Sequence, residues 1–272
     1  MKIISVIENS SQGNDFAFEH GLCVYVETRK HKLLLDTGAS SLFIDNAYRL
    51  GIDLRDIDIV VLSHGHYDHA GGILEFSKIN SKAKIYMQED AINDYYHGDK
   101  YIGIDHRIKD LSQVRFIDGD YCIDDELFLF SDVKERLFWP KSNLELSCKV
   151  NNELIQDDFS HEQYLVITCD NKSILLSGCA HNGILNILNR YYDIYHGYPD
   201  IVISGFHMKK KTDYTKEEME IIKVTARKLH ELPTIFYTGH CTGDTAFDIM
   251  YQIMGNQLKH LYSGGEVYVD MS

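Results

Sequence analysis

Short apolar runs separated by polar turns recur along the chain and predict strands with helices between them. In the N-terminal part, the runs predict strands at residues 2–8, 21–27, 32–36, 57–62 and 83–87. Apolar positions at helical spacing predict helices over 42–50, from 72–76 onward and, as a short element, over 90–96. The N-terminal part therefore alternates strands and helices.

The C-terminal part repeats this alternation. It predicts strands at residues 161–168, 173–178, 200–204, 233–237 and 265–269, and helices over 184–191, 215–229 and 245–254. Thr215 and Glu218 have the spacing of a capping box at the start of one of these helices. Two such halves predict the α/β class and one domain over residues 1–272, built as an αββα sandwich.

Residues from about 98 to 160 follow a looser pattern. They contain strand-like runs at 114–117, 127–130 and 144–150, and we interpret them as an inserted α+β segment near the functional site. The aromatic residues in and beside this segment either line a pocket or fill the small core of the insert, and the second role is the simpler expectation. They are Tyr95, Tyr96, Tyr101, Phe138 and Trp139.

The residues after the strand at 57–62 contain the chain's closest grouping of possible metal ligands: Ser63-His64-Gly65-His66-Tyr67-Asp68-His69. Neutral imidazoles and carboxylates bind zinc, iron or manganese without a thiolate. His64 and His66 alternate and can point to one side, whereas Asp68 and His69 can serve a second ion nearby. Two ions about 3.5–4 Å apart would form a binuclear site. Surface histidines in a polar loop are the alternative, which the density of this cluster disfavours.

Three strands predicted in the C-terminal part end in a glycine near a histidine. These histidines are His181, His207 and His240. The carboxyl ends of strands are where α/β sheets place ligands, and glycine allows close approach of the backbone there. We therefore expect these three histidines to meet the cluster at 63–69.

These motifs resemble those of a known family. A strand followed by H-x-H-x-D-H resembles the signature of the metallo-β-lactamase superfamily, and Asp36-Thr37-Gly38 is similar to the segment that supports its metal loop. The motifs at 178–184, 205–207 and 239–243 are similar to the branch typified by the archaeal dihydropterin–ribofuranosylaminobenzene phosphate synthase. The resemblance covers both halves and excludes most of the insert. It implies the metallo-β-lactamase fold and a metal enzyme, and it leaves the substrate open.

The resemblance also implies a ligand set for two divalent ions, with zinc expected and iron, manganese or magnesium as alternatives. One ion would take His64, His66 and His181, and the other would take Asp68, His69 and His240. Asp36 would fix the metal loop through hydrogen bonds.

His207 departs from the family pattern, which has a bridging aspartate there. A neutral imidazole cannot bridge two cations. His207 therefore ligates one ion, donates to the substrate, or belongs to a site that holds a single ion tightly. Cys179 is an alternative ligand ranked below His181, and His161 is a weaker candidate still.

Composition narrows the range of partners. The 272 residues carry a net charge of −14, which disfavours nucleic-acid binding and a nuclease function. No apolar stretch approaches the ~20 residues of a membrane span, and the N-terminus turns polar too soon for a signal peptide. Six cysteines without a C-x-x-C pair suit a reducing compartment. We expect a cytoplasmic protein with a small-molecule substrate and no membrane or nucleic-acid partner. The sequence does not determine the oligomeric state.

Three functions remain open at this stage. In the first, a metal-dependent hydrolase uses a metal-bound hydroxide, formed because the ion lowers the pKa of water to about 7. Its catalytic residues would be Asp68, which orients the nucleophile, and His207, which stabilises charge on a small ester, lactone or phosphorylated metabolite. The second is a pterin-type transferase that condenses a dihydropterin diphosphate with an arylamine. The third is a non-catalytic metal-binding sensor.

Overall fold

Two seven-stranded sheets pack face to face in the computed structural model, which describes residues 1–169 and 171–269. The order of the first sheet is β18 (Glu266–Val267), β1 (Lys2–Ile7), β2 (Cys23–Glu27), β3 (Lys32–Leu35), β4 (Ile59–Val61), β5 (Lys84–Gln88) and β8 (Val114–Ile117). The order of the second is β17 (Leu258–His260), β16 (Ile235–Thr238), β15 (Ile201–Ile203), β14 (Lys172–Leu176), β13 (Tyr164–Cys169), β10 (Leu127–Phe130) and β9 (Tyr121–Cys122).

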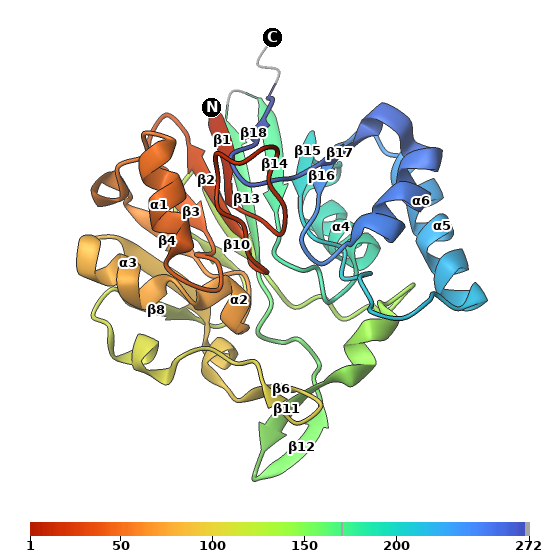
Figure 1. Cartoon of the computed structure of the whole chain (residues 1–272), viewed down its shortest axis with the longest axis horizontal. Helices are drawn as coiled ribbons and strands as arrows, with labels where there is room; N and C mark the ends of the chain where they lie inside the picture. The colour runs from red at the N-terminus through yellow and green to blue at the C-terminus, as the bar shows by residue number, and fades with distance from the viewer. Residues whose placement is uncertain (170, 270–272) are drawn as a thin grey trace.

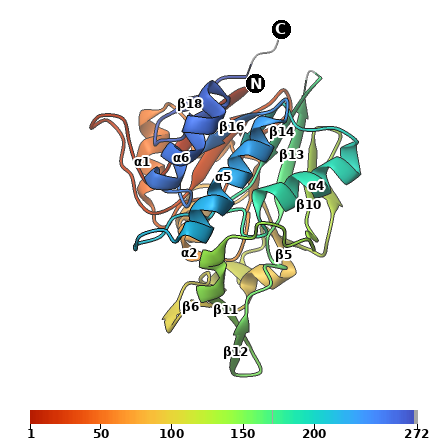
Figure 2. The same ribbon diagram turned by 90° about the vertical axis from the view of Figure 1, so that its right-hand side faces the viewer.

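Helices cover the outer face of each sheet (Figures 1 and 2). The helices of the N-terminal half are α1 (Leu42–Arg49), α2 (Tyr67–Ala70) and α3 (Ile73–Ile79), and those of the C-terminal half are α4 (Ile184–Tyr195), α5 (Lys216–His230) and α6 (Asp244–Met254). Short 3₁₀ turns complete the helical elements: η1 (Leu54–Asp56), η2 (Glu89–Ile92), η3 (His106–Asp110), η4 (Lys141–Glu145) and η5 (Gly255–Gln257). The α/β class and the αββα order predicted from the sequence are confirmed.

The period-2 alternation of side chains along the strands explains these layers. In β3, Leu33 and Leu35 pack between the two sheets, while Leu34 faces α1 and α3 on the outer side. In β14 and β15, Leu175 and Val202 likewise face the outer helices of the second sheet. These central strands therefore have two buried faces, and the polar side chains of the candidate site come from the turns that follow them.

Parallel pairing brings the ends of the central strands to one edge. β3, β4 and β5 run parallel in the first sheet, and β14, β15, β16 and β17 run parallel in the second. The carboxyl ends of such strands are the usual ligand-binding edge of an α/β sheet. The turn after β4 and the turns after β14, β15 and β16 thus lie where a site can form.

A small third sheet lies beside this edge, at the bottom of Figure 1. Its order is β12 (Glu153–Gln156), β11 (Leu146–Val150), β6 (Tyr95–His97) and β7 (Lys100–Tyr101). The segment expected as an insert, 98–160, is divided by the structure. β8 completes the first sheet and β9 and β10 complete the second, so only the parts around β7, β11 and β12 stand outside the sandwich.

Two local expectations can be compared with the structure. The helix predicted over 90–96 is wrong, because η2 ends at Ile92 and β6 follows, pairing Tyr96 with Ser147 of β11. The capping box is confirmed, since Thr215 Oγ1 accepts from the Glu218 backbone at 3.2 Å and Glu218 Oε2 accepts from the Thr215 backbone at 2.7 Å. Among the helices of the described residues, none has the length and apolar character needed to cross a bilayer.

Candidate metal centre

The first group of candidate ligands consists of His64, His66 and His181. His64 and His66 follow β4, and His181 follows β14 on the facing sheet. The Nε2 atoms of His181 and His64 lie 3.3 Å apart, and the His66 ring is 4.6 Å from that of His64 and 4.9 Å from that of His181, between centroids. Zinc–nitrogen bonds of 2.0–2.1 Å in a tetrahedron separate two ligand nitrogens by roughly 3.3 Å. His64 and His181 therefore have the spacing of metal ligands, and the His66 ring lies beside them.

The second group consists of Asp68, His69 and His240. Asp68 Oδ2 lies 3.3 Å from His240 Nε2 and 3.6 Å from His69 Nε2. Asp68 and His69 belong to α2, and His240 follows β16 in the other sheet. His20, which the sequence analysis did not select, reaches the same carboxylate oxygen at 3.4 Å from the segment before β2. The structure thus brings all six side chains expected to bind metal to neighbouring positions at the facing strand ends. The sets whose ligand atoms all lie within 4.8 Å of one another differ from the two expected groups: Cys179 joins His64 to His181 and His69 to His240, Asp68 joins His20 and His240, and His66 joins Asp157 and His161.

The orientation of the imidazoles is fixed by acceptors at Nδ1. The Nδ1 partners are Ser63 Oγ for His64 (2.9 Å), Asp36 Oδ2 for His69 (2.7 Å), Asn143 Oδ1 for His181 (2.9 Å) and Asn9 Oδ1 for His240 (3.0 Å). An oxygen that accepts from Nδ1–H leaves Nε2 with its lone pair, the form that binds a metal. Four lone pairs are therefore aimed at the centre.

Two asparagines hold the histidines of the C-terminal half in the same way. Asn143 Nδ2 donates to the backbone oxygen of His181 at 2.7 Å, and Asn9 Nδ2 donates to that of His240 at 2.9 Å. Each asparagine amide therefore forms hydrogen bonds to both the ring and the backbone of one histidine. Neither asparagine could be selected from the sequence, because no local motif links an asparagine to a histidine 38 or 231 positions away.

Two buried glutamates support the turns that carry these histidines. Glu162 accepts from the backbone N–H of His181 at 2.7 Å, and Glu8 accepts from that of His240. Burial raises the pKa of both carboxyls, although these hydrogen bonds oppose the shift. The backbone of His240 has a φ of 47°, a left-handed conformation that a non-glycine residue adopts at a cost. The glutamate contact helps to hold this strained turn in place.

Asp36 fixes the metal loop of the N-terminal half, as the resemblance implied. Its carboxylate accepts from the Ser63 backbone, the Ser63 hydroxyl and His69 Nδ1, each at 2.7 Å. All three residues are fully buried. The Ser63 hydroxyl gives its hydrogen to Asp36 and can accept from His64, so one carboxylate orders two candidate ligands.

The protonation of His64, His66 and His181 also suits a divalent cation, whereas His69 has to release a proton when an ion binds. Burial and the neighbouring imidazoles hold the pKa of His64 and His181 well below the ordinary value, and burial lowers that of His66 to about 3. Burial alone would lower the pKa of His69, but the carboxylates of Asp36 and Asp68 raise it to about 9. Among the described residues, the buried Nε2 atom of His66 has no hydrogen-bond partner, and the buried Nε2 atom of His240 has only the Asp68 carboxylate nearby, at 3.3 Å. Such atoms are costly unless they bind a ligand, so the residues fit a metal.

The remaining candidates occupy different positions. His207 follows β15, its ring centroid lies 4.1 Å from that of His181, and its Nδ1 is buried without a partner. His161 uses both ring nitrogens, because Nδ1 accepts from the Gly65 backbone at 2.9 Å and Nε2 lies 3.2 Å from Asp157 Oδ2. It therefore supports the metal loop and has no lone pair to offer. Cys179 Sγ lies 3.3 Å from His69 Nε2.

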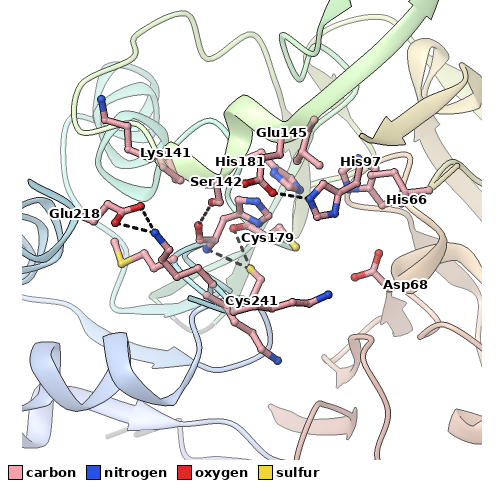
Figure 3. A pocket seen from close by; sticks show the side chains of 18 of the residues that line it. His66, Asp68, His97, Lys141, Ser142, Glu145, Cys179, His181, Glu218 and Cys241 are labelled. Carbon is pink, nitrogen blue, oxygen red and sulfur yellow. Dashed lines mark hydrogen bonds and ion pairs between the residues drawn. The ribbon is translucent and has the colours of Figure 1, made fainter. Parts of the chain in front are cut away.

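A cavity of about 600 Å³ opens onto both groups, with His66, Asp68 and His181 on its floor (Figure 3). Of the five aromatic residues named from the sequence, only Phe138 borders this cavity. Trp139 and Tyr95 instead belong to a small apolar cluster with Phe159, which agrees with the second of the two expected roles. The third sheet therefore has its own core and also forms part of the cavity wall.

Lysines dominate the rim of this cavity. They are Lys100, Lys141, Lys209, Lys210 and Lys211. The two glutamates of the rim already have partners, since Glu145 pairs with His97 at 2.7 Å and Glu218 with Lys210 at 2.8 Å. Among the described residues, Lys100, Lys209 and Lys211 have no carboxylate partner. A chain with a net charge of −14 thus has a cationic entrance to its candidate site.

An αββα sandwich with histidines and a carboxylate at facing strand ends defines a class of metal-binding proteins, and comparisons with known proteins identify the family. The family model for the metallo-beta-lactamase superfamily matches residues 17–137. The crystal structure of Tm1679, a metal-dependent hydrolase of the beta-lactamase superfamily, is 31% identical and covers 99% of each chain with a TM-score of 0.83.

Two further relatives extend along almost the whole chain. The 7,8-dihydropterin-6-methyl-4-(beta-D-ribofuranosyl)-aminobenzene-5'-phosphate synthase of Methanocaldococcus jannaschii is 24% identical over 286 aligned positions, covering 97% of this chain and 95% of the synthase. The metallo-beta-lactamase fold protein YhfI from Bacillus subtilis is 13% identical, covers 98% of each chain and has a TM-score of 0.57, which supports the fold alone. The chain belongs to the metallo-β-lactamase superfamily, whose fold implies divalent metal binding.

Proposed function

We propose that the protein is a metal-dependent hydrolase of a small phosphorylated metabolite, acting at a centre of two divalent ions. The observation that carries the proposal is the convergence of six candidate ligands at facing strand ends, three of which, His66, Asp68 and His181, line one cavity. The ligand types, five imidazoles and one carboxylate, favour zinc. The 31% identity to a metal-dependent hydrolase supports the reaction class.

The ions would supply an acidified water and charge neutralisation at the attacked group. The protein side chains would position the reactants. Asp68 borders the cavity beside His69 and His240, where its second oxygen can orient the attacking water. His207 borders the cavity next to His181 and has an unpartnered Nδ1, which can donate to an oxygen of the attacked group.

The lysines of the rim favour a phosphorylated substrate over an uncharged ester or lactone. Lys209 and Lys211 line the cavity and have no carboxylate partner within residues 1–169 and 171–269. Ammonium groups attract phosphate as point charges. We therefore expect the phosphate of the substrate to lie against these lysines and the scissile bond to lie over the two ligand groups.

A substrate panel with the zinc-loaded protein tests the proposal. Phosphomonoesters, phosphodiesters, carboxylic esters and lactones are assayed with the wild type, His66→Ala and Asp68→Ala, and His106→Ala is the control because it lies outside the cavity. The proposal expects metal-dependent hydrolysis of phosphorylated compounds that is abolished in the first two variants and retained in the control. Full activity of either ligand variant would refute the assignment.

A pterin-type transferase is the second candidate. The 24% identity to the methanogen synthase along 97% of the chain favours it, and a lysine rim also suits a diphosphate leaving group. Pyrophosphate release from a hydroxymethyldihydropterin diphosphate is measured with and without an arylamine. Release that requires the arylamine identifies the transferase, and release without it identifies hydrolysis. Tight metal binding without turnover in either assay would favour the sensor.

A further inference from the structure

The two ligand groups have no member in common, although the ions they hold would be close neighbours. The first group contains three neutral imidazoles, and the second contains a single carboxylate. Two divalent ions about 3.5–4 Å apart repel each other strongly, and a shared anionic ligand reduces this repulsion. His207 cannot fill that role, because an imidazole ring directs each lone pair at one ion.

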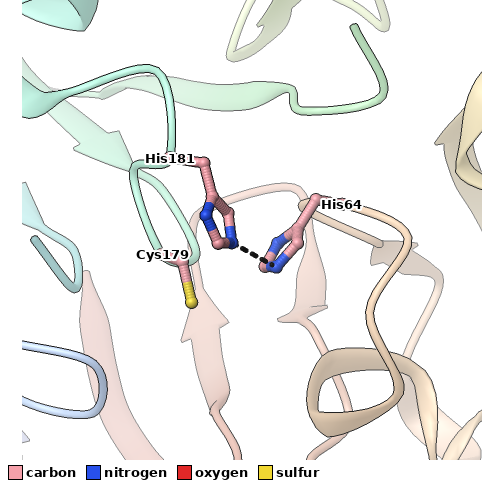
Figure 4. Close-up of side chains that lie close together, drawn as sticks. All are labelled: His64, Cys179 and His181. Carbon is pink, nitrogen blue, oxygen red and sulfur yellow. Dashed lines mark hydrogen bonds between the residues drawn. The ribbon is translucent and has the colours of Figure 1, made fainter. Parts of the chain in front are cut away.

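The sulfur of Cys179 lies between the two groups. Its Sγ is within 4.8 Å of the ring nitrogens of His64 and His181, and also within 4.8 Å of those of His69 and His240. Figure 4 shows the Cys179 and His181 side chains projecting from one loop, with the His181 ring turned toward His64. Among the side chains that the structure describes, Cys179 is the one that these two sets of ring nitrogens share.

The backbone fixes the sulfur in this place. Cys179 follows β14 and is 3% exposed. A Cβ at the preceding residue, Gly178, would overlap the side chain of Ser63, so only glycine lets this loop press against the metal loop. The following residue, Ala180, has a φ of 55°. The position of the sulfur is therefore set by packing and by a strained turn.

Two other atoms point independently to a ligand in this space. Both are buried Nε2 atoms: that of His66 has no hydrogen-bond partner among the described residues, and that of His240 has only the Asp68 carboxylate nearby, at 3.3 Å. One belongs to each ligand group. The 3.3 Å between Cys179 Sγ and His69 Nε2 is also near the roughly 3.5 Å that separates a sulfur from a nitrogen on one tetrahedral zinc.

We infer that Cys179 binds as a thiolate that bridges the two ions, an inference that rests on the two-ion centre proposed above. The thiol would release its proton to solvent when the ions bind, so that sulfur offers one lone pair to each. The centre would then hold two anionic side chains, the carboxylate of Asp68 and this thiolate.

Cys241 is the natural competitor and gives a matched control. It is also buried beside the cavity, and its sulfur accepts from the His207 backbone N–H at 3.2 Å. It forms a potential ligand cluster with Cys179 and His207, but it belongs to neither of the two groups that contain His64 or His69. Replacing each cysteine separately by serine therefore shows which of the two sulfurs binds the ions.

X-ray absorption spectroscopy at the zinc edge tests the bridge directly. The wild type and Cys241→Ser are loaded with two zinc ions per chain, and the number of sulfur neighbours per zinc is measured at about 2.3 Å. A bridge predicts one sulfur per zinc in Cys241→Ser. A sulfur bound to one ion only would give half a sulfur per zinc and would overturn the inference, as would the absence of sulfur.

Cobalt substitution gives a second readout that does not depend on turnover. A thiolate bound to Co²⁺ adds a near-ultraviolet charge-transfer band, which is expected in the wild type and in Cys241→Ser and is expected to be lost in Cys179→Ser. Cys179→Asp should lose the band and still bind two ions, because a carboxylate can also bridge. A band that survives in Cys179→Ser and disappears in Cys241→Ser would assign the sulfur to Cys241 and refute the inference.

The outcomes also separate this inference from the proposed function. Two bound ions without a sulfur signature would refute the bridge and leave the two-ion centre intact. Fewer than two ions bound to the wild type would refute both. If Cys179→Ser fails to fold, as judged by circular dichroism, the sulfur count in Cys241→Ser still decides the question.

Discussion

Replacing Asp36 with asparagine tests how much the hydrogen bonds around the metal centre contribute to metal affinity, because the substitution leaves all six candidate ligands in place. Asp36 accepts three hydrogen bonds of 2.7 Å in a fully buried position, from the Ser63 backbone, the Ser63 hydroxyl and His69 Nδ1. Asparagine has the same shape but only one acceptor oxygen. If the asparagine oxygen accepts from His69, the asparagine NH₂ group faces the backbone N–H of Ser63. Two buried N–H donors then point at each other.

The other orientation of the amide is the one we expect. Its oxygen accepts from the Ser63 backbone, and its NH₂ group donates to His69 Nδ1 and to the Ser63 hydroxyl. His69 must then carry its proton on Nε2, the atom aimed at the second ion. Altered support of a ligand typically lowers metal affinity 10–100-fold, or about 1.4–2.8 kcal/mol. The weakened hydrogen bonds should cost the metal-free fold a further ~1–3 kcal/mol.

Zinc affinity of Asp36→Asn is measured by competition with a chromophoric chelator, and stability by urea denaturation of the metal-free protein. Asp53→Asn is the matched control, because Asp53 is exposed, caps η1 and does not line the cavity. The control should keep both values within about 0.5 kcal/mol of the wild type. Wild-type affinity for both ions in Asp36→Asn would refute the reasoning.

Three further predictions address the other supports of the molecule. Asn143→Ala, which removes the clamp on His181, should lower the affinity for one zinc about 10–100-fold in the same titration, whereas the exposed Asn189→Ala should not. Phe43→Ala empties a fully buried site in α1 and should lower the free energy of unfolding by about 3–5 kcal/mol, against less than about 0.5 kcal/mol for Tyr48→Ala, which is 85% exposed on the same helix. Burial opposes the charge of His31, but hydrogen bonds to Asp58 and Asp124 raise its pKa, so its contribution to stability is full below about pH 6.5 and fades as the pH rises through the raised value. Urea denaturation of His31→Gln should therefore show a larger loss at pH 5.5 than at pH 9, and an equal loss at both would contradict the assignment.

The candidate ligands could be found from the sequence because their signals are local. His64, His66, Asp68 and His69 directly follow a buried strand, and the turns of His181 and His240 follow β14 and β16 in the same way. Parallel pairing then brings these strand ends to one edge. The position of each of these side chains could therefore be predicted once the preceding strand was recognised in the sequence.

The supports of the ligands could not be found in this way. Asn9, Asn143, Glu8 and Glu162 reach their histidines from other elements, and their contacts depend on how distant segments fold together. The same reason explains the wrong helix over 90–96. Tyr96 pairs with Ser147, a partner 51 positions away, and this non-local pairing outweighs the local helical pattern.

Anomalous diffraction at the zinc edge from crystals of the zinc-loaded protein tests the central claim most directly. The account predicts two zinc peaks, one among His64, His66 and His181 and the other among Asp68, His69 and His240. Zinc peaks away from these side chains, or none at either group, would contradict it.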